Sequence, residues 1–247
     1  MLAGTDLSRY LHSDPQRTRH SMALADGLIG LHDEVAAEVP SALRERLMIV
    51  HQSAQAATER WAPREDCFEV CVVGHLREEK DSLLAAKAVR ELPKASRLRV
   101  HLLGRAMDDV WRQRAEAEQC RNRRFVWLGE VAPEQVRETM ARARVMVISS
   151  RAEGGANVVS EACVAGLPVI ASDIPGNRGL LGKDYPGYFP VGDSLALRRC
   201  LLRAESEPEW LATLRWHCQK QASLFTPEAE SAALARAIAK VTEVQGR

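Results

Sequence analysis

A short segment near the middle of the chain combines two acidic residues with two adjacent glycines. Glu153 and Glu161 stand eight positions apart, and Gly154 and Gly155 follow the first of them. Glycines let a backbone turn tightly and approach a ligand closely, and the first N–H groups of a following helix are available to an anion. Glu161 would lie about 7–8 Å along that helix, given a rise of ~1.5 Å per residue. That is roughly the span from a diphosphate to the ribose of one nucleotide.

The segment therefore predicts a nucleotide site in which backbone amides bind a diphosphate and a carboxylate binds a sugar diol. An alternative is an ordinary amphipathic helix with an exposed glutamate. In that interpretation the apolar stripe consists of Val158, Val159, Ala162 and Cys163, and Asn157, Ser160 and Glu161 lie off it.

The elements that must position this segment form an alternating pattern after residue 65. Short apolar runs predict strands at residues 68–73, 98–103, 125–129, 145–149 and 168–171. Helical patterns lie between them at residues 82–92, 108–119, 133–143 and 156–165, and the chain is helical again from about residue 194 to its end. Strands separated by helices imply right-handed crossovers and a parallel sheet covered on both faces. We therefore expect an α/β fold.

The first 60 residues predict less structure. Short strands are expected within residues 24–31 and 47–50, and Asp14 with Pro15 marks a helix start. A region with only two or three strands cannot bury both faces of a sheet, so it looks like the end of a second α/β domain. We expect a partial N-terminal domain at 1–62, a complete domain at 63–226, and a last helix at 227–247 that packs back toward the N-terminal part.

Composition excludes several functional classes. The chain has 247 residues and a net charge of +1, which favours neither nucleic acid nor an anionic membrane. No apolar run reaches the ~20 residues of a membrane helix, and the N-terminus has no signal-peptide pattern. The six cysteines form no CxxC pair, so we expect reduced core thiols and a cytoplasmic protein. No metal-binding, P-loop or α/β-hydrolase motif is present.

A second segment could supply positive charge at the same edge of the sheet. Gly74 and His75 follow the first predicted strand, and Arg77 and Lys80 come shortly after them. Lysine offers a point charge to a phosphate, and arginine offers a planar fork. A solvated, mixed-charge helix start is the alternative.

Two further strand ends fall on this edge. Leu128 and Gly129 could present backbone groups to a base, or form a plain turn. Residues 173–179, which include Asn177, form a glycine-rich loop that could contact sugar or phosphate, or be only a turn.

These motifs resemble those of the family 4 glycosyltransferases, which have two facing Rossmann-like domains in the GT-B arrangement. The resemblance covers residues 67–243 as the donor-binding domain and residues 1–66 as the end of the acceptor domain. It implies that Glu153 lies near the donor sugar, that Glu161 contacts the ribose, and that Lys80 neutralises the diphosphate. It also implies that the diphosphate meets the backbone amides of Gly154, Gly155 and Ala156. His75 replaces an arginine common in the family, so Arg77 is expected to substitute.

A narrower resemblance links the chain to the selenosugar synthases of selenoneine biosynthesis. It rests on residues 2–7, 74–81 and 153–156, and on Gly176 and Asn177 through residues 184–189. It implies a UDP-sugar donor, selenophosphate as the acceptor, and no cofactor. Gly4, Thr5, Asp6 and Asn177 would lie on the acceptor side, Asn157 on the donor side, and Glu153, Lys80 and Arg77 would be catalytic. A non-catalytic nucleotide-binding fragment and a UDP-sugar epimerase remain as alternatives.

Overall fold

The larger part of the molecule is a six-stranded sheet in which all neighbouring strands are parallel. The computed structural model describes residues 1–2, 4, 6–55 and 62–245. The strand order β5-β4-β3-β6-β7-β8 reverses direction between β3 and β6, which makes this junction the topological switch point where open α/β sheets bind ligands. The strands are β3 (Phe68–Val73), β4 (Leu98–Leu103), β5 (Phe125–Gly129), β6 (Val145–Ile148), β7 (Val169–Ser172) and β8 (Tyr188–Phe189).

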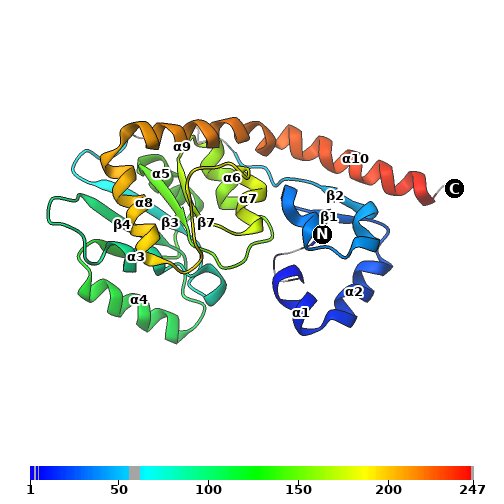
Figure 1. Cartoon of the computed structure of the whole chain (residues 1–247), viewed down its shortest axis with the longest axis horizontal. Helices are drawn as coiled ribbons and strands as arrows, with labels where there is room; N and C mark the ends of the chain where they lie inside the picture. The colour runs from blue at the N-terminus through cyan, green and yellow to red at the C-terminus, as the bar shows by residue number, and fades with distance from the viewer. Residues whose placement is uncertain (3, 5, 56–61, 246–247) are drawn as a thin grey trace.

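Helices cover both faces of this sheet, which explains why its strands are short and apolar. On one face α3 packs against α8, and on the other α6, α7 and α9 pack against one another (Figure 1). Val70, Val100, Val145 and Ile170 in the strands are fully buried. The helices are α3 (Leu84–Val89), α4 (Asp109–Arg121), α5 (Pro133–Arg142), α6 (Asn157–Val164), α7 (Pro175–Leu181), α8 (Ser194–Ser206) and α9 (Pro208–Gln221). The predicted α/β fold with a parallel sheet is confirmed.

Two elements beyond β7 differ from the prediction. Residues 173–179 were expected as a loop, but most of them form α7, which starts at Pro175. Proline at the first helical position has the backbone angle that a helix needs and lacks an N–H that would otherwise be unpaired. Tyr188–Phe189 adds a sixth strand beside β7. A two-residue strand carries too little periodicity to be predicted.

A smaller part precedes the sheet. Its strands β1 (Leu28–Gly30) and β2 (Leu47–Ile49) pair in parallel, as the two expected strands would. The side chain of Asp14 accepts a hydrogen bond from the amide of Arg17 and caps α2 (Pro15–Leu24). A π-helix, two 3-10 helices and a short helix complete this part: η1 (Asp6–Tyr10), α1 (Leu11–Ser13), η2 (Asp33–Ala37) and η3 (Ser41–Arg46). It has a small core of its own.

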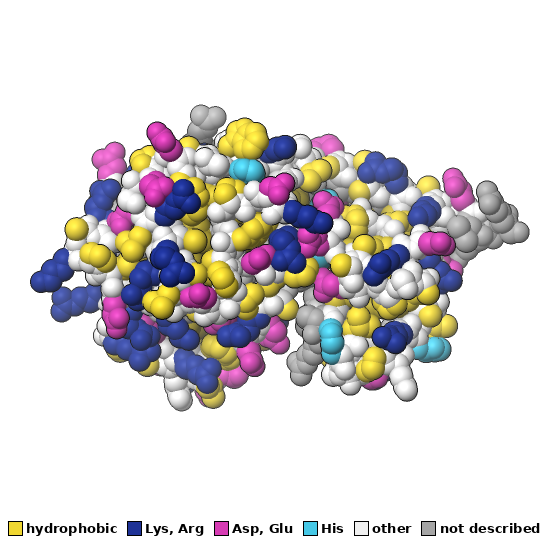
Figure 2. All heavy atoms as spheres, viewed as in Figure 1, with side chains coloured by type: hydrophobic (Ala, Val, Ile, Leu, Met, Phe, Trp, Pro, Cys, Tyr) yellow, Lys and Arg dark blue, Asp and Glu magenta, His cyan; other side chains and the backbone are white. Residues whose placement is uncertain are grey.

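The last helix, α10 (Pro227–Gln245), follows the short 3-10 helix η5 (Ala222–Phe225) and extends from the larger part over the top of the smaller part (Figure 1). The Nζ of Lys240 donates to the carbonyl of Glu45 at 3.1 Å. The amide of Ser53 donates to Glu230 Oε2 at 3.0 Å. Basic and acidic side chains are interspersed over the face shown in Figure 2, as the small net charge suggests. Within the described residues, no helix has the length and hydropathy needed to cross a membrane.

The two parts meet where α7 packs against η2. The Nε of Arg178 donates to Glu34 Oε2 at 2.9 Å across this contact. A Cβ added at Gly179 would lie 2.6 Å from His32 Nδ1 and 2.9 Å from the amide nitrogen of Asp33. The close approach of α7 to η2 therefore requires glycine at position 179.

We predict that Gly179→Ala lowers the free energy of unfolding by about 1–3 kcal/mol, the usual cost of overpacking. The added methyl group must push α7 away from η2. Chemical denaturation followed by circular dichroism measures the change. An unaltered denaturation midpoint would show that the two parts do not pack as closely as described.

Candidate functional site

The chain after β3 forms a tight turn that is fastened to the segment after β6. Residues Glu78–Lys80 make a single 3-10 turn, η4, and Asp81 then adopts the left-handed conformation with φ 42°. The hydroxyl of Ser149 donates to the carbonyl of Asp81 at 2.9 Å. The guanidinium of Arg151 donates to the Asp81 carboxylate at 3.0 Å. Such contacts hold a residue in a conformation that is unfavourable by itself.

The helix predicted at residues 82–92 is wrong in its extent, because this turn occupies its beginning. The helix that forms, α3, spans only Leu84–Val89. The preceding residues adopt the turn conformation because they are bonded to the neighbouring strand end, a long-range contact that local periodicity does not contain.

The turn brings Lys80 to Glu153. The Lys80 Nζ lies 2.6 Å from Glu153 Oε1, and the side chains are 19% and 9% exposed respectively. The Ser150 hydroxyl donates to the same carboxylate oxygen at 2.5 Å. Two of the three residues predicted to be catalytic thus form one hydrogen-bonded cluster at the switch point. The third residue, Arg77, instead faces Glu79 of its own turn, with its Nε 3.9 Å from Glu79 Oε2.

The glycine pair makes the predicted turn between β6 and α6. Gly155 has φ 122°, and a Cβ there would overlap the Cβ of Leu31 in the smaller part. Ala156 is the N-cap residue of α6 and provides no side-chain cap. The first amides of the helix are therefore not capped by that side chain, as an anion site at a helix N-terminus requires.

Glu161 is the fifth residue of α6 and is partly buried. The side-chain Nδ2 of Asn157 donates to Glu161 Oε1 at 3.1 Å. Burial raises the pKa of the Glu161 carboxyl, although the positive charge of Arg137 acts to lower it. Ser160, expected off the apolar stripe, is buried.

The ends of β3, β4 and β5 are joined into one surface. The amide of Gly74 donates to the carbonyl of Leu103 at 2.8 Å, and the amide of Gly104 donates to the carbonyl of Gly129 at 2.7 Å. His75 Nδ1 accepts a hydrogen bond from the amide of Arg105 at 3.3 Å. Leu128 beside Gly129 is exposed. The four donor-side residues predicted at these strand ends, Gly74, His75, Leu128 and Gly129, therefore lie along the carboxyl edge of the sheet.

The residues predicted for the acceptor side have different surroundings. Gly4 packs against the Glu153–Gly154 backbone, where an added Cβ would lie 2.5 Å from the nitrogen of Gly154. Thr5 lies outside the described residues. Asn177 is fully buried, and its side-chain amide donates to the carbonyl of Ser172 at 2.9 Å. The expectation that Asn177 contacts an acceptor is thus corrected: in this conformation it stabilises the end of β7.

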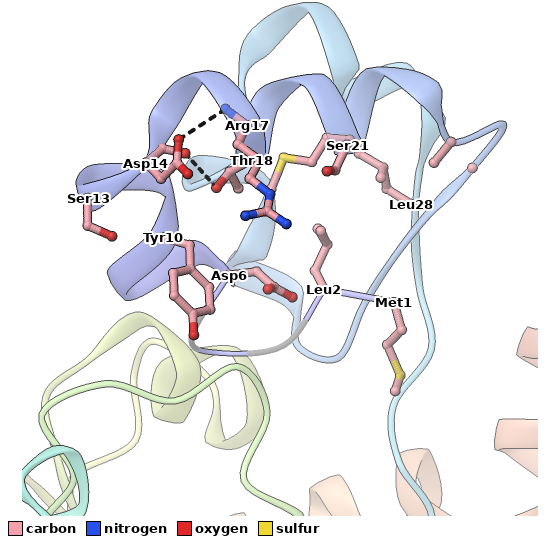
Figure 3. A pocket seen from close by; sticks show the side chains of 13 residues that line it. Met1, Leu2, Asp6, Tyr10, Ser13, Asp14, Arg17, Thr18, Ser21 and Leu28 are labelled. Carbon is pink, nitrogen blue, oxygen red and sulfur yellow. Dashed lines mark hydrogen bonds between the residues drawn. The ribbon is translucent and has the colours of Figure 1, made fainter.

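Asp6 borders a separate hollow of about 640 Å³ in the smaller part. Leu2, Met22 and Leu28 form its buried floor. Asp6, Tyr10 and Arg17 stand around it in Figure 3. Asp6 is only two positions along the chain from Gly4, which touches the Glu153–Gly154 backbone.

Sequence reasoning missed His32. This residue is fully buried, neither ring nitrogen has a hydrogen-bond partner among the residues that the structure describes, and Gly179 packs against the ring. Burial lowers the pKa of the imidazole despite the nearby carboxylates of Glu34 and Asp33. The available signal was the position of His32, which follows the end of β1 and directly follows Leu31, the residue that contacts Gly155. The residue was missed because no other histidine lies near it in the sequence.

Metal and disulfide chemistry find no support in the residues that the structure describes. They contain no cluster of three or more His, Cys, Asp or Glu side chains able to hold a metal ion. The six cysteines are free thiols, and Cys67 and Cys71 are buried as expected.

Comparison with known proteins identifies the family of the chain. The family model "Glycosyl transferases group 1" matches residues 54–223, which is more than half of the chain. An 82-residue stretch is 34% identical to the putative teichuronic acid biosynthesis glycosyltransferase TuaC of Bacillus subtilis, and covers 33% of this chain and 21% of TuaC.

Solved structures share the fold. The crystal structure of HepE from Anabaena in complex with UDP and glucose matches with a TM-score of 0.81 and 19% identity, over 95% of this chain and 70% of HepE. Sucrose-phosphate synthase from Thermosynechococcus elongatus matches with a TM-score of 0.75 and 20% identity, over 96% of this chain and 64% of that one. The chain is thus shorter than the proteins it resembles.

The raised pKa of Glu161 yields a stability prediction. An acid whose pKa is higher in the folded state binds its proton more tightly there, so its favourable contribution is complete at low pH and is lost as the pH rises through the folded pKa. Glu161→Gln should therefore raise the melting temperature at pH 7, with a gain that disappears below about pH 4. Glu130→Gln, at an exposed position near the same edge, is the control and should change nothing. A lower melting temperature for Glu161→Gln at pH 7 would contradict the assignment.

Proposed function

Because this chain belongs to the glycosyl transferases group 1 family, we propose that it transfers a sugar from a UDP-sugar to a small nucleophile. The observation that carries the proposal is the cluster at the switch point. Lys80 and Glu153 meet beside the N-terminus of α6, and Glu161 stands just over one turn further along the same helix. The complex of HepE, which has the same fold, with UDP and glucose supports a UDP-sugar as the donor.

The chain's own groups would divide the work as follows. The amides of Gly154, Gly155 and Ala156 and the ammonium of Lys80 stabilise the negative charge that develops on the departing diphosphate. The Glu161 carboxylate accepts hydrogen bonds from the ribose, with Asn157 holding it in place. Glu153 accepts hydrogen bonds from the donor sugar. The surface formed by Leu128, Gly129, Gly74 and His75 holds the base.

Magnitudes show why all of these groups are needed. A helix N-terminus contributes about 0.3–2 kcal/mol to an anion, and hydrogen bonds to a charged group about 1.5–3 kcal/mol. Micromolar affinity requires about 8 kcal/mol. Neither the glycine turn nor Lys80 suffices alone, so each should be necessary. Because amides and Lys80 supply the positive charge, we propose that no cofactor takes part.

For the acceptor we propose selenophosphate, on the resemblance to selenosugar synthases. The selenium atom attacks the anomeric carbon, the bond from that carbon to the UDP oxygen breaks, and UDP leaves with the electron pair. In this proposal the acceptor enters on the side of Gly4, which contacts the Glu153–Gly154 backbone, and of Asp6, which borders the hollow. Closure of the two parts would exclude water from this step.

We predict that Lys80→Ala and Glu161→Ala each weaken UDP binding about 10- to 100-fold, because each removes a charged hydrogen-bonding partner. Isothermal titration calorimetry measures the affinities. Lys220→Ala on α9, where the lysine lies over Trp216, is the control and should bind UDP as the parent does. Equal UDP affinities in the parent protein and the three variants would show that the nucleotide does not bind at this site.

The reaction itself is tested by UDP release. We expect UDP to appear from UDP-glucose or UDP-N-acetylglucosamine only when selenophosphate is present, and a product with a carbon–selenium bond by mass spectrometry. UDP release from UDP-N-acetylglucosamine alone would indicate an epimerase or hydrolase. Binding of UDP without turnover of any donor would indicate a non-catalytic module.

A further inference from the structure

The carboxylate of Glu153 is shared between two hydrogen-bond donors. Its Oε1 accepts from Lys80 Nζ at 2.6 Å and from Ser150 Oγ at 2.5 Å. The Glu153 side chain is only 9% exposed, so these protein groups replace much of the water that would otherwise solvate the charge. Of these two donors, only Lys80 carries a positive charge.

Glu153 and Lys80 differ in their freedom to move. A Cβ added at Gly176 in α7 would lie 2.9 Å from the Cβ of Glu153, and one added at Gly4 would lie 3.1 Å from its carbonyl carbon. Glu153 is thus packed from both sides. Lys80 carries its ammonium on a flexible four-carbon stem. If one partner moves when a ligand arrives, it is Lys80.

Under the proposed function the diphosphate needs the same ammonium. Movement of Lys80 to a phosphate oxygen leaves Glu153 with Ser150 as its remaining donor. A buried charge that loses a partner has an unfavourable free energy. Free UDP offers no replacement donor at this position, whereas the hydroxyl groups of a donor sugar do.

We propose that Glu153 exchanges Lys80 for the hydroxyl groups of the donor sugar, and that this exchange makes the site prefer a UDP-sugar to UDP. The inference rests on the proposed function and goes beyond it, since it assigns Glu153 the discrimination between substrate and product. UDP binding breaks the ion pair without compensation, and UDP-sugar binding compensates for it. The site would therefore release UDP readily after transfer.

The test is the affinity of Glu153→Gln for UDP and for UDP-glucose, measured by calorimetry without an acceptor. The neutral amide holds Lys80 weakly, so UDP should bind about five- to tenfold more tightly than to the parent protein. The preference for UDP-glucose over UDP should fall by a similar factor. Ser150→Ala should have the opposite effect and weaken UDP binding, because Glu153 then loses its last donor when Lys80 moves away.

Glu79→Gln is the matched control. It removes a negative charge from the residue beside Lys80, and its side chain is 40% exposed, so it reports the general effect of charge on UDP affinity. The exchange requires a larger gain in Glu153→Gln than in this control. Circular dichroism should show that all variants are folded.

The outcomes separate the two proposals. If the parent protein binds UDP and Glu153→Gln binds it equally or more weakly, Lys80 contacts both groups at once and the exchange is wrong while the proposed function stands. If Ser150→Ala binds UDP more tightly, the exchange is also wrong. If the parent protein does not bind UDP, both proposals fail.

Discussion

The arrangement of the molecule depends on the meeting of two chain segments at the reversal of strand order. β3 and β6 are adjacent and parallel, so the turn after one and the glycine turn after the other emerge at the same edge. This edge brings together Lys80 and Glu153, which are far apart in sequence, so that Lys80 Nζ lies 2.6 Å from Glu153 Oε1. Hydrogen bonds from Ser149 and Arg151 to the Asp81 segment keep the two turns in register. The sheet thus creates the site, and the loops supply its chemistry.

Glycines form the second constraint, because they let three segments approach the Glu153 turn. Gly4 and Gly176 pack directly on it, and Gly155 within it packs against Leu31 of the smaller part. Gly179 extends the same contact to His32. The smaller part can therefore pack closely on the turn because glycines at the contact have no side chains. A larger residue at any of these positions would push the contacting backbone segments apart. His32 is buried at this contact, without a hydrogen-bond partner among the described residues.

Much of this architecture could be predicted from the sequence because local signals and long-range packing agree. The apolar runs of β3, β6 and β7 are buried strands, Asp14 caps α2, and Pro133 starts α5. Glu161 lies in the fifth position of the predicted helix, so its distance from the turn followed from helix geometry alone.

The remainder could not be predicted because the deciding contacts are distant in sequence. Asp81 adopts a left-handed conformation only through its partners after β6. A loop rich in glycine became α7 because its glycines face the Glu153 turn and η2. Asn177 looked like a polar residue free to bind a ligand, but Ser172 occupies its amide inside the fold.

The central claim is that the glycine turn binds a diphosphate while the carboxylate further along α6 binds the ribose. A crystal structure with UDP bound tests it most directly. The account predicts phosphate oxygens within hydrogen-bonding distance of the amides of residues 154–156 and of Lys80, with the ribose hydroxyls on Glu161. A nucleotide bound elsewhere, with this turn empty, would contradict it.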